Sequence, residues 1–273
     1  MNKMKLLNLG CGSRFHKDWL NIDFKSNHED VKEFDLRKGI PLESNSVSVV
    51  YSSHVLEHFQ KEAAPSFLKE VHRVLEPGGI IRIVVPDLEQ IVRAYLKEFD
   101  MGFKGDHASI IRMKWLVNEL LDQVQRNYSG GETIKWWNQE IIPEIDFIKL
   151  RLGNEFKNFL NFKSNQLARV SFWKKPKEKL RKIIRFLKNL ILNSLGFTLE
   201  MAEIGKFRLS GEVHYWMYDS VSLSELLKES GFRNIRICKC NESEIPSFNS
   251  YYLDIDEYGT SRKPDSLYME ATK

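Results

Sequence analysis

The sequence predicts a doubly wound α/β fold: a seven-stranded, mostly parallel sheet with a large, mostly helical insertion after the fifth strand. Three observations support this prediction. Short apolar runs alternate with segments of helical periodicity over the first hundred residues. The first apolar run stops at a glycine bend, Gly10 to Gly12. The alternation is then lost from about residue 100 and returns only near residue 211.

The glycine bend predicts a nucleoside site. The apolar strand 6–9 runs into Gly10 and Gly12, and a second strand, 20–22, ends at Asp23. Ligands of such sheets lie beyond the carboxyl ends of the strands. There the Asp23 carboxylate could accept hydrogen bonds from both hydroxyls of a ribose. A glycine turn without any ligand is the alternative.

The pattern around the bend argues against a dinucleotide. The fingerprint G-x-G-x-x-G places an acidic residue about 20 positions further on. Here Phe15 stands at the third glycine position, and Asp23 follows Gly12 by only 11 residues. We therefore expect an adenosine-bearing ligand without a pyrophosphate.

The remaining strands are predicted from short β-branched or apolar runs bounded by turn residues. Ser53 and His54 follow the fourth of them and should lie beside the ligand. A helix over 67–75 is expected to end at the Pro-Gly-Gly sequence 77–79. The expected strands are 31–34, 47–51, 80–85, 235–238 and 267–271.

We expect one domain over residues 1–273, with a core of 1–99 and 212–273 and an insertion of 100–211. The insertion is too long for an unstructured loop in a compact domain. Its place after the fifth strand puts it at the carboxyl edge of the sheet, which suits a lid or an acceptor-binding part.

The segment 176–195 reads as a basic amphipathic helix. The net charge of the chain is only +4, but residues 174–188 hold eight basic residues and one acidic residue, +7 in total, which leaves about −3 for the rest. A helix packed on the core is the simplest interpretation. Contact with a membrane surface or with an anionic polymer is the alternative. Nucleic acid is disfavoured because no known nucleic-acid-binding module accompanies the helix.

Targeting signals and cysteines indicate the compartment. The N-terminus lacks an apolar signal region, and no run of 18 apolar residues is present. The three cysteines lack metal-ligand spacing, which suits a reducing environment. We expect a cytoplasmic protein, either free in the cytoplasm or at the inner face of the membrane. The sequence leaves the oligomeric state open.

Four motifs together resemble the class I S-adenosylmethionine (SAM) dependent methyltransferases, whose sheet is Rossmann-like. They are the Gly-x-Gly bend, the acidic strand end, the 41–58 string with its Val-Leu-Glu-His ending, and the Pro-Gly-Gly sequence before the fifth strand. The resemblance implies SAM as cofactor and an antiparallel last pair of strands. It also implies that Asp35 contacts the adenine, although a turn cap explains this aspartate equally well. Gly10, Gly12, Asp23, Asp35, Leu36, Ser53 and His54 are the expected cofactor-binding residues.

The string 214–219, with the helix after it, resembles bacterial methyltransferases associated with cell-surface polysaccharide synthesis. This resemblance implies a sugar or glycan intermediate as acceptor. The alternatives are an RNA, lipid or other small-molecule methyltransferase, or a protein of this fold that binds SAM without catalysis.

An acceptor hydroxyl must lose its proton as it attacks the methyl group, and histidine is the best base near neutral pH. His54 and His214 are the candidate bases, and Asp87 could bind or deprotonate the acceptor. Each could instead be structural. If the segment after His54 is helical, His58 faces the same side as His54. No cluster with ligand spacing indicates a metal, so we expect none, although an ion shared by Asp87 and Asp219 stays open.

Overall fold

The computed structural model describes residues 4–167 and 178–273, and the basic residues at 174, 175 and 177 lie outside these ranges. The strands are β1 (Leu6–Leu9), β2 (Leu20–Asp23), β3 (Val31–Glu33), β4 (Val47–Ser53), β5 (Leu75–Pro86), β6 (Arg233–Cys238) and β7 (Ser266–Thr272). The helices are α1 (Ala64–Val74), α2 (Leu88–Phe103), α3 (His107–Gln125), α4 (Gly131–Trp137), α5 (Ile145–Leu152), α6 (Asn154–Leu167), α7 (Glu178–Ser194), α8 (Leu199–Arg208) and α9 (Ser220–Glu229).

In the described residues the strands form one sheet in the order β3-β2-β1-β4-β5-β7-β6. The first five strands are parallel, and β7 is antiparallel to both β5 and β6. The predicted sheet is therefore confirmed, with its antiparallel pair at one edge. The chain order reverses between β1 and β4, which is where ligands bind in such sheets.

The end of α1 differs from the prediction. The helix ends at Val74, and β5 begins directly at Leu75. The Pro-Gly-Gly sequence lies within β5, at a shift in register between its pairing with Val47 and with Val49. The extra residues are accommodated there as an irregularity in the strand, a position that glycine favours.

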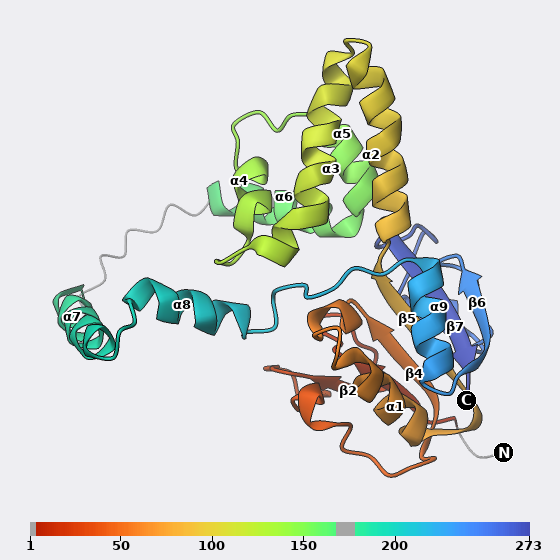
Figure 1. The fold of residues 1–273 in the computed structure, drawn as a ribbon. Coiled ribbons are helices and arrows are strands. Elements are labelled where there is room, and N and C mark those ends of the chain that lie inside the picture. The colour runs from red at the N-terminus through yellow and green to blue at the C-terminus, as the bar shows by residue number, and fades with distance from the viewer. Residues whose placement is uncertain (1–3, 168–177) are drawn as a thin grey trace.

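Both faces of the sheet are covered by apolar side chains. On one face, α1 and α9 pack against central strand residues such as Leu7 and Val50, which are fully buried. On the other, Trp19 and Phe248 pack against Tyr51. Figure 1 shows the sheet with α1 and α9 beside it.

The insertion has a hydrophobic core of its own. Helices α2 and α3 run side by side above the sheet, and α4, α5 and α6 lie against them (Figure 1). Trp115, Trp137 and Phe156 are buried together at their centre. The expected boundary at residue 99 falls inside α2, which continues to Phe103. Helix α2 thus connects the sheet directly to the insertion.

Helices α7 and α8 extend away from the sheet (Figure 1). Most of the described apolar side chains of α7 are exposed rather than packed on the core, with 62% exposure at Leu190 and 61% at Ile191. None of the helices among the described residues has the length and apolar character needed to cross a bilayer.

Candidate functional site

A cavity of about 540 Å³ lies between the carboxyl edge of the sheet and the helical insertion. The sheet contributes the glycine bend and the end of β4, and the insertion contributes α3, α4 and α6. The loop before β7 closes a further side. Five of the expected site residues line the cavity: Gly10, Gly12, Ser53, His54 and His214.

The glycine bend has the backbone geometry that the sequence predicted. Gly10 and Gly12 have φ of +64° and +53°, a region that other residues rarely adopt. A Cβ atom at Gly10 would lie 2.2 Å from Cγ2 of Val55, whereas nothing stands within 4 Å of a Cβ at Gly12. Gly10 therefore keeps the bend packed on the protein, and Gly12 leaves room above it for a ligand.

Asp23 lies against the bend, although it does not line the cavity. Its Oδ2 accepts a hydrogen bond of 2.6 Å from the backbone N–H of Gly12, and its Oδ1 accepts one of 3.3 Å from that of Lys25. An ionised carboxylate has about four acceptor positions. Asp23 thus fixes the bend and retains capacity to bind a ribose hydroxyl.

Asp35, Leu36 and Asp87 are not brought into the cavity. Asp35 caps a short 3₁₀ turn, Leu36–Lys38, and forms a two-point ion pair with Arg37, which lowers the pKa of Asp35. Leu36 packs against the main core. Asp87 caps α2 by accepting a hydrogen bond from the backbone N–H of Gln90. Asp35 and Asp87 are thus both helix caps, which is the structural alternative that the sequence left open for each of them.

His54 is held in a strained and partly buried position. It has φ of +56°, and its Nε2 lies 2.8 Å from Ser266 Oγ. Its Nδ1 lies 3.3 Å from Oε1 of Glu57. Burial and the nearby Lys263 charge lower the pKa of His54 well below its usual value. The imidazole is therefore neutral at pH 7 and can accept a proton.

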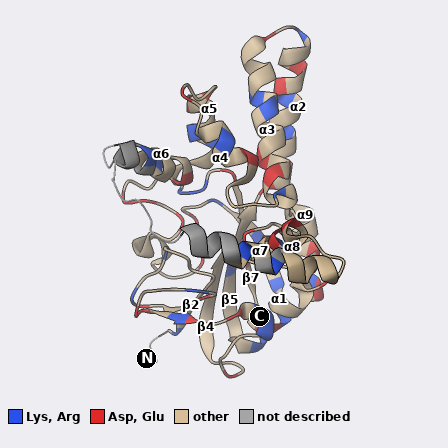
Figure 2. Cartoon of the chain, turned by 90° about the vertical axis from the view of Figure 1, so that its left-hand side faces the viewer, with Lys and Arg blue, Asp and Glu red and all other residues tan. Residues whose placement is uncertain are grey.

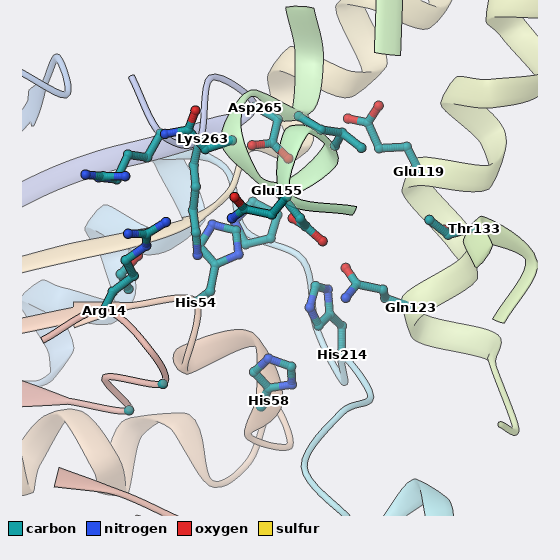
Figure 3. A pocket seen from close by; sticks show the side chains of 18 of the residues that line it. Arg14, His54, His58, Glu119, Gln123, Thr133, Glu155, His214, Lys263 and Asp265 are labelled. Carbon is teal, nitrogen blue, oxygen red and sulfur yellow. The ribbon is translucent and has the colours of Figure 1, made fainter. Parts of the chain in front are cut away.

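Two further histidines lie beside it (Figure 3). His58 and His214 are in edge-to-face contact, with ring centroids 4.7 Å apart. His58 Nδ1 lies 3.0 Å from the carbonyl oxygen of Val213 and must donate to it. Burial lowers the pKa of both rings. The segment after His54 is not an α-helix, because the left-handed backbone at His54 is followed only by a 3₁₀ turn, Leu56–His58.

Glu57 is a site residue that sequence reasoning missed. Its side chain is fully buried, and burial raises its pKa to about 8. Together with His58 and His214 it forms a cluster of potential metal ligands. Sequence spacing gave no indication of this cluster, because the fold joins residues that are about 160 positions apart. Asp87 and Asp219, the pair considered for an ion, cap α2 and α9 instead.

The individual residues that line the cavity opposite the glycine bend were also not predicted from the sequence. Glu119, Gln123 and Thr133 reach it from α3 and α4, and Glu155 reaches it from α6 (Figure 3). The loop before β7 adds Lys263 and Asp265, and Arg14 follows the glycine bend. Burial and the neighbouring Glu119 and Glu155 raise the pKa of Asp265 to about 7. For Glu119, Gln123, Thr133 and Glu155, only their place in an insertion beside the carboxyl edge was foreseeable from the sequence.

A family model described as "Methyltransferase domain" matches residues 17–83, about a quarter of the chain. This range contains the strands β2 to β4, α1 and most of β5. No curated protein matches the chain.

Solved structures of SAM-dependent methyltransferases resemble the chain at low identity. A protein from Archaeoglobus fulgidus shares 12% identity, with 100% of this chain and 87% of that chain covered and a TM-score of 0.38. One from Thermotoga maritima, described as a possible histamine N-methyltransferase, shares 10% identity, with 100% and 84% covered and a TM-score of 0.39. One from Aquifex aeolicus shares 19% identity, with 30% and 55% covered and a TM-score of 0.25.

The chain spans 54%, 32% and 55% of three of the solved structures that it matches. Their TM-scores are below 0.5, so these similarities do not support a functional assignment. The conclusion rests instead on the domain match and on the fold and site described above. The cavity volume lies within the range of about 300–1,000 Å³ typical of small-ligand sites. Residues 17–83 thus match a methyltransferase domain, the described strands form a seven-stranded Rossmann-like sheet, and S-adenosylmethionine is the cofactor that the glycine bend and Asp23 fit.

Proposed function

We propose that the protein is a SAM-dependent methyltransferase that methylates a hydroxyl group of a sugar or glycan intermediate. The observation that carries the proposal is the shared cavity: neutral imidazoles line it beside the glycine bend, and polar side chains of the insertion line the opposite side. This arrangement suits an acceptor whose hydroxyl oxygen lies in line with the SAM methyl group and whose hydroxyl proton is within reach of an imidazole.

The chain's own residues would divide the work as follows. Gly10 and Gly12 let the adenosine approach the backbone, and Asp23 accepts hydrogen bonds from the ribose. SAM supplies a sulfonium methyl group. The acceptor oxygen forms the new C–O bond as the C–S bond breaks, and the electron pair of the C–S bond stays on sulfur in the departing S-adenosylhomocysteine. His54 or His214 takes the hydroxyl proton at a ring nitrogen. Enclosure by the insertion aligns the reactants and excludes water.

The lining of the insertion side favours a polyhydroxylated acceptor. Gln123, Asn154 and Asn158 offer amide donors and acceptors, and Glu155 offers a carboxylate, whereas the Glu119 carboxylate is already paired with Arg151 and Trp115. Such groups pair with hydroxyls, and an acceptor without them would leave these polar groups unpaired at a cost in binding. An RNA or lipid acceptor has no comparable support in this lining.

The test is transfer of radiolabelled methyl from SAM into fractionated cell extract, followed by identification of the labelled compound. Label in a sugar or glycan fraction supports the proposal. SAM binding without transfer to any fraction would favour a non-catalytic binding protein, and label in RNA or lipid would replace the acceptor class.

Replacing the base should slow the chemical step. We expect His54→Ala or His214→Ala to lower kcat by about 10²–10⁴-fold, because general base catalysis contributes about that much. SAM affinity measured by calorimetry should change little, which separates lost chemistry from lost cofactor binding. Exposed His107→Ala is the matched control. Full methyl transfer by both variants would exclude a histidine base.

We also propose that α7 contacts an anionic membrane surface. Ile184, Phe186 and Leu190 of this helix are exposed apolar side chains, and the basic Arg185 and Lys188 are exposed between them. Figure 2 shows α7 and α8 on the face turned to the viewer, with Lys and Arg in blue. Exposed apolar and basic side chains on one helix match the apolar and anionic layers of a lipid surface.

Reversing charge on α7 should weaken vesicle binding. We expect Arg185→Glu combined with Lys188→Glu to reduce sedimentation with phosphatidylglycerol vesicles at least tenfold, because each basic residue near an anionic surface contributes about 1 kcal/mol. The matched control reverses two exposed charges elsewhere, Lys228→Glu and Arg233→Glu. Equal losses in both double variants, or equal binding to neutral phosphatidylcholine vesicles, would contradict a specific role for α7.

A further inference from the structure

We propose that Glu57, His58 and His214 bind a divalent transition-metal ion, Zn²⁺ in the first place, beside the acceptor position in the cavity. Each residue offers one ligand atom, and these three atoms all lie within 4.8 Å of one another. Two imidazoles and one carboxylate are a common protein ligand set for Zn²⁺ at catalytic sites, where the remaining position is open to water or substrate. His58 and His214 both line the cavity, so an open position would face it.

The spacing allows an ion with a small contraction. Glu57 Oε1 and His214 Nε2 lie 4.0 Å apart. Ligand atoms around a tetrahedral Zn²⁺ are about 3.4 Å apart, given bond lengths of about 2.1 Å. Side-chain movements of less than 1 Å would therefore bring these two atoms to binding distance, and the other pairs, which lie within 4.8 Å, need at most about 1.4 Å. An ion among the three atoms would supply the attraction for that movement.

The carboxylate of Glu57 independently indicates a missing partner. Its side chain is 0% exposed, and neither of its oxygens has a hydrogen-bond partner among the described residues. The nearest basic atom is His54 Nδ1 at 3.3 Å, outside hydrogen-bond geometry. Burying an unpaired carboxylate is costly, so such a group either takes up a proton or coordinates a cation.

His58 has the orientation expected of a metal ligand. Its Nδ1–H donates to the backbone carbonyl of Val213 at 3.0 Å, which leaves Nε2 as the nitrogen with a free lone pair in the neutral ring. Metal-binding histidines almost always donate their other N–H to a carbonyl or carboxylate, which fixes the ring. The hydrogen bond to Val213 also ties this orientation to the segment that delivers His214.

The role of the ion rests on the proposed function. An acceptor hydroxyl bound at the open position would become more acidic, because the cation stabilises the alkoxide. In that arrangement His214 holds the ion, and His54, which is no member of the ligand set, remains free to take the proton. The site would thus explain why three histidines gather at one cavity although the reaction needs one base.

The ion can be tested without turnover. Untagged full-length protein is treated with EDTA, passed through a desalting column and dialysed against Zn²⁺, with bound metal measured by atomic emission. We expect one Zn²⁺ per chain and an increase in Tm on addition of Zn²⁺. Substitution with Co²⁺ should give visible absorption bands of a four- or five-coordinate site.

Variants assign the ion to the cluster. We expect Glu57→Gln, His58→Ala and His214→Ala each to weaken Zn²⁺ binding by more than about 100-fold, since even changes outside the direct ligands cost about 10–100-fold. Glu57→Gln nearly preserves the size of the side chain, and calorimetric SAM binding reports whether each variant is folded. His107→Ala, an exposed histidine on α3, should bind Zn²⁺ like the wild type.

Unchanged Zn²⁺ affinity in all three folded variants, or no stoichiometric binding by the wild type, would overturn the site. The two proposals fail separately. Zn²⁺ binding that is lost in the variants supports the ion site even if no extract accepts a methyl group. Methyl transfer by a wild type that binds no Zn²⁺ would remove the ion and leave the proposed function standing.

Discussion

Replacing Gly12 by valine is expected to weaken SAM binding by at least about 100-fold, or roughly 2.7 kcal/mol. Nothing in the protein lies within 4 Å of a Cβ at this position, so the new side chain would project into free space at the cavity. That is the space an adenosine needs to approach the bend. Isothermal titration calorimetry with SAM measures the loss directly.

A control variant at Gly78 distinguishes the loss of SAM affinity caused by a blocked site from the loss caused by backbone strain. Gly12 has φ of +53°, and a residue with a Cβ is strained there by about 1–2 kcal/mol whatever the space around it. Gly78 has φ of +77° with equally open surroundings, but it lies near the start of β5, away from the cavity. Gly78→Val should lose similar stability and keep its SAM affinity. If both variants bind SAM like the wild type, the bend is not the cofactor site.

Replacing Arg82 by methionine should lower the free energy of unfolding by about 3–5 kcal/mol, because removal of one partner from a buried ion pair leaves an uncompensated charge. Arg82 is fully buried in β5 and donates to Asp254 at 2.6 Å and to Glu270 at 2.7 Å. It also donates to the backbone carbonyls of Lys239, Cys240 and Glu242. Methionine would leave Asp254 without its charged partner, would leave Glu270 only Arg236 as a charged partner, and would remove a donor from each of the three carbonyl groups.

Urea denaturation followed by circular dichroism measures this loss as a lower midpoint at constant slope. The matched control is Arg93→Met, which breaks an ion pair with Glu89 on the surface of α2, where the arginine side chain is 76% exposed. Exposed pairs contribute about 0–1 kcal/mol, so this variant should stay close to the wild type. Equal losses in the two variants would contradict a special role for the buried network.

The sheet was predictable because its signals are local. Apolar runs of four to seven residues, glycines at turns and the acidic end of β2 each occur within a few positions of one another. The site was predictable only where it uses the same local signals. Gly10, Gly12, Ser53 and His54 lie at or within three residues of strand ends, and all four line the cavity.

The cluster around Glu57 was not predictable, because its members come from distant segments and one of them has an unusual burial. A glutamate is normally read as exposed, but the left-handed turn at His54 directs Glu57 inward. His214 reaches the same place after the whole insertion, where its backbone N–H donates to the carbonyl of Gln123. The one local signal for Glu57 was its place between apolar Leu56 and Phe59.

The separate hydrophobic core of the insertion has an evolutionary consequence. Because Trp115, Trp137 and Phe156 pack with one another rather than with the sheet, mutations can accumulate around them while the strands that bear the glycine bend keep their sequence. The acceptor half of the cavity can then diversify at its own pace. Under the proposed function, homologous chains would keep the sheet half of the cavity for the methyl donor and vary the insertion half for different acceptors.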